Sequence, residues 1–284
     1  MRIAVTGATG FVGSRLVARL MADGHTVVGL ARSPGSAQKL IDRGCKFVQG
    51  DLWALPAVRT AVQRCDAVFH LAAEHRLGIR RQERKRMRDT NVLGTECLLD
   101  AAIEEGVPRI VHCSGVTVFG DTHGQVVDET YRRPEGEGFL SYADETKTLG
   151  HRLAEARIAD GAPITIVQPG QIYGPGDTSA VGLQLAAAAA GTLERLVFPG
   201  LGLVFCHVDD VVDGLLRALA SGRPGRRTCS EASGRRSGRR SRSPRGRAAG
   251  PRRRAPSRRS SCARSRRSAR WAGGSPGCRR TSAR

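Results

Sequence analysis

Past Gly222 the sequence contains no Val, Ile, Leu, Met or Phe. Residues 223–284 are mostly Arg, Ser, Gly, Ala and Pro, and they carry 22 arginines against one acid, Glu231. A segment without large aliphatic residues cannot bury enough surface to offset its chain entropy, so we expect a disordered basic tail. Subtracting the tail's charge of +21 from the chain's +20 leaves residues 1–222 close to neutral, with 24 basic and 25 acidic residues.

Two origins of this tail stay open. Its composition matches what a GC-rich gene encodes in a shifted reading frame, because the codons of Arg, Ala, Gly and Pro are GC-rich. A natural basic tail would instead neutralise phosphates and bind nucleic acid without base specificity. Its single aromatic residue, Trp271, offers little stacking on bases. Nucleic acid is therefore expected as a partner only non-specifically, and only if the tail is genuine.

Residues 1–222 also lack Cys-x-x-Cys pairs, a secretory leader and a membrane-length apolar run. Scattered cysteines favour free thiols in a reducing compartment and no metal site. Met1 leads directly into a predicted strand rather than into the charged and apolar regions of a signal peptide. The longest weakly polar stretch, 181–191, is too short to cross a bilayer. We expect a cytoplasmic protein without a membrane segment.

Short runs rich in Val and Ile alternate with helix-length amphipathic segments through residues 1–222. This alternation is typical of βαβ units, so we predict an α/β fold: a Rossmann-type doubly wound parallel sheet with helices on both faces. The predicted strands are 2–6, 26–31, 46–49, 67–71, 109–113, 164–168 and 203–207. The predicted helices are 13–22, 55–64, 90–105, 145–160 and 209–220, the last with Asp209 as its N-cap.

A glycine-rich segment, Thr6-Gly-Ala-Thr-Gly-Phe-Val-Gly13, lies between the first predicted strand and the first predicted helix. Gly7 permits a sharp turn, Gly10 lets the backbone approach a pyrophosphate, and Gly13 lets the helix pack closely on the strand. The start of the predicted helix presents free N–H groups and the positive end of the helix dipole to phosphate, and Phe11 and Val12 are candidate cofactor contacts beside it. The segment therefore predicts a dinucleotide site.

The end of the second predicted strand indicates which dinucleotide binds. An acid there would hold the ribose 2′-hydroxyl, whereas an arginine suits a 2′-phosphate. The strand leads into Arg32 and contains no acid. Arg32 therefore favours NADP, with NAD as the alternative cofactor if Arg32 is only a solvent-facing loop residue.

The spacing of the three glycines, with several later motifs, resembles the extended short-chain dehydrogenase/reductase family, of the NAD-dependent epimerase/dehydratase type. The resemblance covers about residues 1–222, and the later motifs are Gly50-Asp-Leu52, Phe69-His-Leu-Ala-Ala73, Asn91-Val-Leu-Gly94, Gln168-Pro-Gly-Gln-Ile-Tyr-Gly-Pro-Gly176 and Val208-Asp-Asp-Val211. Beyond the glycine-rich turn, it implies cofactor contacts from Asp51, Leu52, Leu71, Ala72, Ala73, Lys147, Pro169 and Ile172.

The same resemblance implies a catalytic Ser/Thr, Tyr and Lys set, for which the candidates are Ser114, Tyr142 and Lys147. In such a set the tyrosinate is the acid/base, the lysine lowers its pKa, and the hydroxyl residue orients the substrate oxygen. Tyr142 precedes Lys147 by five residues instead of four, an offset of about 140° around a helix. Ala143 occupies the usual tyrosine position and Gly115 the usual serine position.

Three interpretations of these departures stay open. Tyr142 reaches the nicotinamide if the helix begins at Ala143 or carries a bulge. Alternatively, the site has lost its chemistry and only binds nucleotide, or the sequence is locally corrupted. We expect an NADPH-dependent reductase of a ketone or aldehyde group in a small molecule. An impaired dinucleotide-binding protein and a nucleotide-sugar epimerase or dehydratase are the alternatives, and a homodimer is left open.

Two further features concern charged and titratable side chains. Residues 74–89 carry seven Arg or Lys against three acids, and they either line an anionic-substrate side of the cleft or form a solvated helix face. His70, His112 and His207 lie at predicted strand ends without metal-ligand spacing, so we expect structural roles for them.

Overall fold

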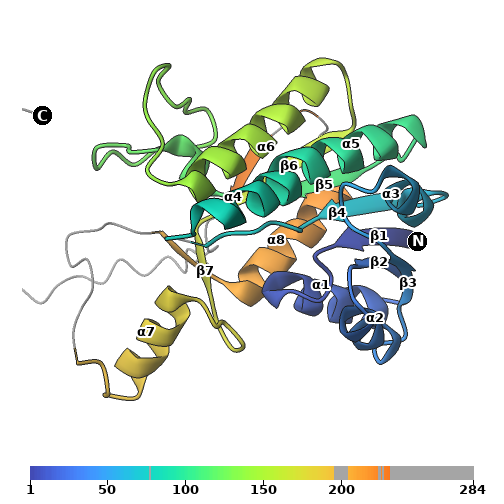
Figure 1. Cartoon of the computed structure of the whole chain (residues 1–284), viewed down its shortest axis with the longest axis horizontal. Helices are drawn as coiled ribbons and strands as arrows, with labels where there is room; N and C mark the ends of the chain where they lie inside the picture. Colours follow the sequence, from blue (N-terminus) through green and yellow to red (C-terminus); the bar gives the residue numbers. More distant parts are fainter. Residues whose placement is uncertain (77, 195–203, 223–224, 226, 231–284) are drawn as a thin grey trace, which may run out of the picture. The chain divides into compact units, whose positions relative to one another are not determined.

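A seven-stranded parallel sheet forms the centre of the computed structural model (Figure 1). The structure describes residues 1–76, 78–194, 204–222, 225 and 227–230. Across the sheet the strands are β3 (Lys46–Gln49), β2 (Thr26–Ala31), β1 (Arg2–Thr6), β4 (Ala67–His70), β5 (Ile110–Cys113), β6 (Ile164–Pro169) and β9 (Arg227–Ser230). A separate parallel pair is formed by β7 (Gln171–Tyr173) and β8 (Phe205–His207).

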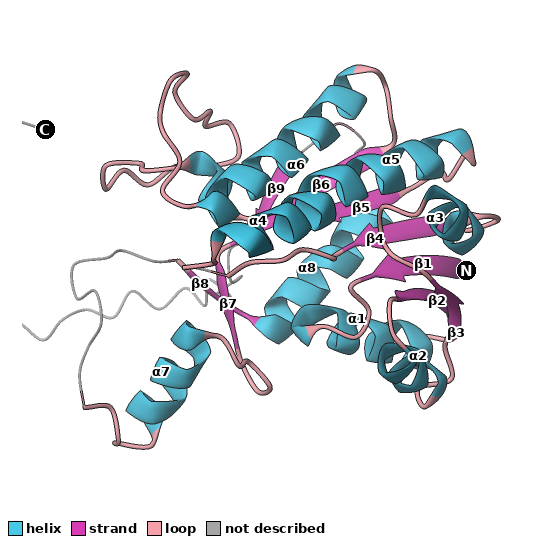
Figure 2. Cartoon of the chain, in the orientation of Figure 1, coloured by secondary structure: helices cyan, strands magenta, loops and turns pink. Residues whose placement is uncertain are grey.

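Helices cover both faces of the sheet (Figures 1 and 2). One face carries α1 (Phe11–Ala22), α2 (Pro34–Ile41) and α8 (Val208–Ser221), and the other carries α3 (Leu55–Val62), α5 (Gly94–Glu104) and α6 (Tyr142–Ala159). The remaining helical elements are α4 (Arg81–Arg88), a π-helical turn (Asp89–Leu93) that joins α4 to α5, a 3-10 turn (Val116–Phe119) after β5, and α7 (Ala180–Ala189). The predicted Rossmann-type doubly wound fold is confirmed.

Successive strand residues enter two separate cores, one on each face of the sheet. In β1, Ile3 and Val5 join the core beneath α1, α2 and α8, whereas Ala4 joins the core beneath α3, α5 and α6. In β4, Phe69 lies in the first core and Val68 in the second. Strands buried on both faces are nearly continuous apolar runs, which is why the sequence predicts them well.

The chain changes direction across the sheet at β1, which pairs with β2 on one side and with β4 on the other. In open α/β sheets, ligands bind outside the carboxyl ends of the strands at such a switch point. The glycine-rich turn follows β1 directly, so it lies at this edge of the sheet.

Several helices begin at residues other than those predicted, and α1, for example, begins at Phe11 rather than Gly13. The start of α6 is Tyr142, because Ser141 Oγ accepts a hydrogen bond from Asp144 N at 3.1 Å and caps the helix. The start of α8 is Val208, and its N-cap is His207, whose ring nitrogen accepts from Asp209 N. The prediction of Asp209 as the N-cap is therefore wrong.

The sheet also continues past Gly222, where the predicted domain ends. The last strand, β9, pairs in parallel with residues Ile166–Pro169 of β6. Such pairing is made by backbone groups and requires no alternation of apolar residues, so composition does not predict it. Residues 231–284, most of the expected tail, lie outside the described residues, as does residue 203 of the predicted strand 203–207.

Candidate dinucleotide and catalytic site

Two of the three glycines are required by the turn itself. Gly7 has a positive φ of 71°, and a side chain there would lie 2.8 Å from Ala72 N. A side chain on Gly13 would overlap the carbonyl group of Gly7. The turn is closed by a hydrogen bond of 2.9 Å from Gly10 N to Gly7 O. These contacts place the start of α1 tightly against the end of β1.

Gly10 differs from the other two glycines because little protein surrounds it. It is exposed, has an extended conformation, and an added Cβ would meet only Gly7 O, 3.2 Å away, within the described structure. A side chain at this position would therefore require only a small shift of Gly7 O, and the space beyond this contact is open to a ligand that approaches the backbone. A dinucleotide pyrophosphate fits this cradle.

The amino end of α1 supplies the charge complement for a phosphate. The first N–H groups of a helix, here from Phe11 onward, have no partner within the helix. The N-cap is Gly10, which has no side chain to cap these groups, and the first turn contains no acid. The positive end of the helix dipole therefore faces the open cradle without a competing carboxylate.

A chain of buried hydrogen bonds joins the end of β1 to the π-helical turn. Thr6 Oγ1 lies 2.8 Å from His70 Nδ1, and His70 Nε2 lies 2.9 Å from Thr95 Oγ1. Thr95 Oγ1 donates to Asn91 O at 2.8 Å, so Nε2 of His70 is the donor to Thr95 and Nδ1 accepts from Thr6. Burial lowers the pKa of His70 to about 3, which keeps its ring neutral.

Hydrogen bonds to Thr6 and to Asn91, the two ends of this hydrogen-bonded series, fix the segment that follows β4. Ala72 N donates to Thr6 Oγ1 at 3.3 Å. Glu74 N donates to Asn91 Oδ1 at 2.7 Å, and Asn91 Nδ2 donates to Glu74 O at 2.8 Å. Leu71, Ala72 and Ala73 are thereby held between the end of β1 and the π-helical turn.

The residues predicted to contact the adenosine half of the cofactor lie directly after β2 and β3. Arg32 is exposed directly after β2, and no acidic side chain pairs with it among the described residues. The next residue, Ser33, caps α2 and lies 2.6 Å from Ser36 through their hydroxyl oxygens. Asp51 is half-buried after β3, whereas the side chain of Leu52 is buried in the core. Leu52 can therefore contact a cofactor only through its backbone.

Lys147 lies at the carboxyl end of β5, where its Nζ donates to Cys113 O at 3.4 Å. Burial of the ammonium group lowers the pKa of Lys147. Lys147 also lines a small cavity of about 10 Å³, together with Ala72, Ala73, Asn91, Thr95, His112 and Gly150. The Lys147 side chain thus lies beside the segment after β4.

Tyr142 does not share this position. It is the first residue of a regular α-helix, so the five-residue spacing to Lys147 corresponds to an offset of about 140°. The Arg84 guanidinium lies 5.2 Å from the centre of the Tyr142 ring. Ala143 is buried instead, with 1% of its surface exposed. Neither a helix start at Ala143 nor a bulge is found in α6, so neither condition for Tyr142 to escape helical spacing is met.

Ser114 is buried at the end of β5, and its Oγ lies 2.9 Å from Nδ1 of His151 on α6. The following Gly115 is extended, with φ of 174°. A Cβ on Gly115 would meet Pro169 O and Thr117 Oγ1 at 3.6 and 3.7 Å, which are ordinary contacts. A serine at position 115 would therefore fit. The sequence reasoning missed His151, although its four-residue spacing from Lys147 places the two on one helix face.

The loop after β6 completes the edge. Pro169 is the last residue of β6, and Ile172 in β7 packs against the core beneath α1. Arg15 of α1 holds this region in place, because it donates to Pro175 O and to Asp209 Oδ1, both at 2.8 Å. The motif Val208-Asp-Asp-Val211 at the start of α8 is therefore linked to α1 by the contact between Asp209 and Arg15.

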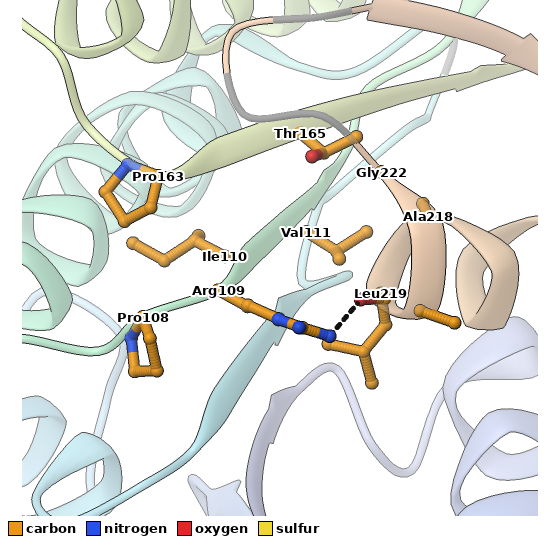
Figure 3. Close-up of a pocket in the computed structure, with 10 residues that line it drawn as sticks. Pro108, Arg109, Ile110, Val111, Pro163, Thr165, Ala218, Leu219 and Gly222 are labelled. Carbon is orange, nitrogen blue, oxygen red and sulfur yellow. Dashed lines mark hydrogen bonds between the residues drawn. The ribbon is translucent and has the colours of Figure 1, made fainter.

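The larger cavity lies elsewhere. It measures about 210 Å³ and lies at the amino ends of β5 and β6, beside the end of α8 (Figure 3). Arg109 donates to Leu219 O at 2.9 Å there, and Pro108, Pro163, Thr165 and Gly222 are among its lining residues. It faces the edge of the sheet opposite the glycine-rich turn, so it is not part of the candidate site.

Other sequence features have simple placements. The basic residues of α4 are exposed, and several pair with acids, for example Lys85 with Asp89 at 2.6 Å. No group of three or more potential metal-ligating side chains occurs in the described part of the chain. None of the helices within the described ranges has the length and apolar character needed to cross a membrane.

Fold and site together define a Rossmann-type domain with a glycine-rich turn at the switch point of the sheet and a buried lysine at the carboxyl end of β5. The chain belongs to the NAD dependent epimerase/dehydratase family, whose model matches residues 3–228.

Similar proteins include enzymes with different reactions. A 4-hydroxy-2-methyl-3-oxo-4-farnesyl-3,4-dihydroquinoline-1-oxide ketoreductase of Stigmatella aurantiaca is 34% identical over 79% of this chain and 66% of its own length. A UDP-glucose 4-epimerase of Mycolicibacterium smegmatis is 32% identical over 80% of this chain and 76% of its own length.

A solved structure of the double mutant of DesIV, a dTDP-glucose 4,6-dehydratase from Streptomyces venezuelae with NAD and DAU bound, has a TM-score of 0.69. It is 26% identical, and the match covers 81% of this chain and 76% of that one. With respect to the ketoreductase described above, the chain spans about two thirds of that protein's length.

Proposed function

We propose that this protein binds NADP(H) at the glycine-rich turn and reduces a ketone or aldehyde group of a small molecule. The observation that carries the proposal is the open cradle above Gly10, which the fold itself leaves unfilled. Bound there, the cofactor would supply a hydride to the carbonyl carbon. Its phosphates would contact the backbone at Gly10, Phe11 and Val12.

The preference for NADP rests on the residues that follow β2. Arg32 is exposed and has no acidic partner within the described structure, so it is available to a 2′-phosphate. The hydroxyl groups of Ser33 and Ser36 lie at the start of α2, close to Arg32 in the chain. NAD is the alternative cofactor, since a relative has NAD bound in its solved structure.

The remaining predicted contacts divide between the two ends of the cofactor. Asp51 and the backbone of Leu52 would hold the adenine end, beside β3. Leu71, Ala72, Ala73, Pro169 and Ile172 would line the nicotinamide end, with Lys147 between cofactor and substrate. Lys147 would orient the ribose and raise the local positive charge, which favours a developing oxyanion.

We further propose that turnover is slow. The side chain that follows helical spacing toward Lys147 is Ala143, and Tyr142 lies against Arg84. General acid/base catalysis typically contributes about 10²–10⁴-fold, and a misplaced tyrosine forfeits much of it without weakening cofactor binding. We therefore expect this protein to bind the cofactor normally but to catalyse the reduction slowly.

Two assays test the proposal. Fluorescence titration compares NADPH with NADH, and loss of NADPH absorbance is followed with a panel of aliphatic aldehydes, aromatic ketones and cyclic ketones. We expect tighter binding of NADPH and slow oxidation with at least one carbonyl class. Saturable NADPH binding without turnover of any carbonyl would support the alternative, a catalytically impaired dinucleotide-binding protein.

A nucleotide-sugar epimerase or dehydratase is the second candidate, motivated by the similar epimerase and dehydratase. Incubation with UDP-glucose distinguishes it, because epimerisation converts the sugar without net consumption of cofactor. Formation of an epimer with no carbonyl reduction would replace the reductase proposal.

A further inference from the structure

A basic surface lies on α4, whose sequence is Arg81-Gln-Glu-Arg-Lys-Arg-Met-Arg88. Residues 74–89 carry seven Arg or Lys against three acids, whereas the rest of residues 1–222 carries 17 basic and 22 acidic side chains. All seven basic residues are exposed, and the only buried residue of α4 is Met87. Positive charge is therefore concentrated around one helix of an otherwise acidic part of the chain.

Three arginines of this surface have no acidic partner among the described residues. The acids of the region, Glu74, Glu83 and Asp89, form ion pairs with Arg76, Arg80, Lys85 and Arg86. The arginines without such a pair are Arg81, Arg84 and Arg88. Spacings of three and four residues place these three on one face of α4, so their charges lie together and are not neutralised.

Arg84 is held at the start of α6 by an aromatic ring. Its guanidinium lies over the Tyr142 ring, 5.2 Å from the ring centre, and α4 packs beside α6 (Figure 1). A guanidinium that lies over a ring face keeps the N–H groups in its own plane free for an oxygen group. Asp144, the buried acid of the first turn of α6, does not occupy these donors, because it is bound by Arg133 at 3.0 Å. The Arg84 donors are therefore available to a ligand.

Two features connect the surroundings of Arg84 to Lys147. Asn91, in the π-helical turn after α4, donates to Thr146 Oγ1 at 3.0 Å, and Thr146 directly precedes Lys147. Tyr142 precedes Lys147 by five residues of regular helix, which is about 7.5 Å along the helix axis. A substrate whose carbonyl group lies at Lys147 therefore reaches Arg84 if it carries an anionic group at the other end of a short chain.

We propose that Arg84, with Arg81 one helical turn before it, binds an anionic oxygen group of the carbonyl compound that this protein reduces. The inference rests on the proposed reductase function and names its substrate class, a carbonyl compound that also carries a carboxylate or a phosphate. The Arg84 guanidinium would donate two parallel hydrogen bonds to this group. The Tyr142 ring would hold the guanidinium in place, so Tyr142 is a positioning residue for substrate binding.

The first test measures anion binding without turnover. Equilibrium dialysis of labelled hexanoate, and separately of labelled inorganic phosphate, uses the full chain with NADP⁺ at an ionic strength of about 0.1 M. We expect a saturable site for at least one of the two probes. Arg84→Gln should lower its affinity about tenfold, because charge-assisted hydrogen bonds are lost. The probe that binds more tightly identifies the anionic group as a carboxylate or a phosphate.

The matched control is Arg217→Gln, which should bind both probes as wild type does. Arg217 is an exposed arginine of α8, on the opposite face of the sheet, without an acidic partner in the described part of the chain. The arginines of residues 223–284 are present in all three proteins and add the same background. Equal affinities in wild type and Arg84→Gln, or no saturable binding of either probe, would overturn the anion site.

The second test compares the reduction of adipate semialdehyde with that of its methyl ester, and of glyceraldehyde phosphate with that of glyceraldehyde. We expect kcat/KM to be about tenfold higher for the charged member of the pair that matches the preferred probe. Arg84→Gln should remove this preference mainly through KM, whereas Tyr142→Phe, which keeps the ring, should retain it. Equal kcat/KM for both members of each pair would refute the anion site and leave the reductase standing. Failure of wild type to reduce any carbonyl compound would refute the reductase, and the dialysis would still decide whether Arg84 binds an anion.

Discussion

Acid should destabilise this fold through the buried histidine that links the glycine-rich turn to α5. The pKa of His70 falls from 6.5 to about 3 because burial disfavours its charged form. Between these values the unfolded chain binds a proton that the folded chain does not, so stability is complete above the unfolded pKa and is lost as pH falls. The loss is about 2 kcal/mol between pH 7 and pH 5 and at most about 5 kcal/mol over the whole window.

The variant that isolates this contribution is His70→Gln. Glutamine cannot titrate, but it loses part of the bonding to Thr6 and Thr95, so we expect lower stability at neutral pH together with a weaker dependence on acid. Urea unfolding, followed by circular dichroism at about pH 7 and about pH 5, measures both free energies of unfolding. His112, whose pKa burial also lowers, retains a pH dependence of the same sign in the variant.

The matched control is His123→Gln, which removes an exposed histidine and should preserve the wild-type difference between the two pH values. If His70→Gln loses stability between the two pH values by as much as wild type does, His70 is not held neutral, and the assigned hydrogen-bond chain is incorrect. Should the variant fail to fold, the NMR titration of His70 in wild type decides the question, since a ring that titrates near its ordinary pKa refutes the reasoning.

Three further predictions concern the site and the tail. Ala143→Tyr should raise reductase activity by up to about 10²-fold, and Gly115→Ser should add to the gain, because a side chain at position 115 fits without displacing its neighbours. If Tyr142→Phe instead abolishes a robust wild-type rate, Tyr142 is the working acid. Arg32→Ala should narrow the preference for NADPH over NADH by about 1–3 kcal/mol in fluorescence titrations, and equal affinities in wild type would contradict the NADP assignment. Removing residues 231–284 should leave NADPH affinity within about a factor of two and abolish salt-sensitive retention on heparin, and a large loss of affinity would show that the tail contributes to the site.

The sequence predicted the central strands because their physical signal is local. Residues such as Ile3, Val68 and Ile164 lie in apolar runs, and burial on both faces of a sheet requires such runs. The elements that it missed lack this signal. In α4, only Met87 is buried, so no apolar stripe marks the helix. The start of α2 is marked by Ser33 and Pro34 rather than by apolar residues, so a search for apolar periodicity does not find this helix.

The candidate site was predictable as far as its chemistry lies in one segment. The spacing of the glycine-rich turn predicts a dinucleotide site, and the structure places Gly7, Gly10 and Gly13 at the switch point of the sheet. The contact between Ser114 and His151 could not be predicted, because the two residues come from β5 and α6 and meet only when α6 packs on the sheet. The unfavourable placement of Tyr142 depended on the helix start, which Ser141 sets by capping.

Equilibrium titration with NADPH, read by cofactor fluorescence, tests the central claim most directly when wild type is compared with Gly10→Val. The extended backbone of Gly10 accepts a side chain with one close contact, so the variant should fold while its side chain fills the pyrophosphate position. Gly138→Val is the matched control, because a Cβ there meets no atom within 4 Å. We predict saturable binding to wild type and to Gly138→Val, and none to Gly10→Val. Undiminished binding to a folded Gly10→Val protein, or no binding to wild type, would contradict the assignment of the cofactor site.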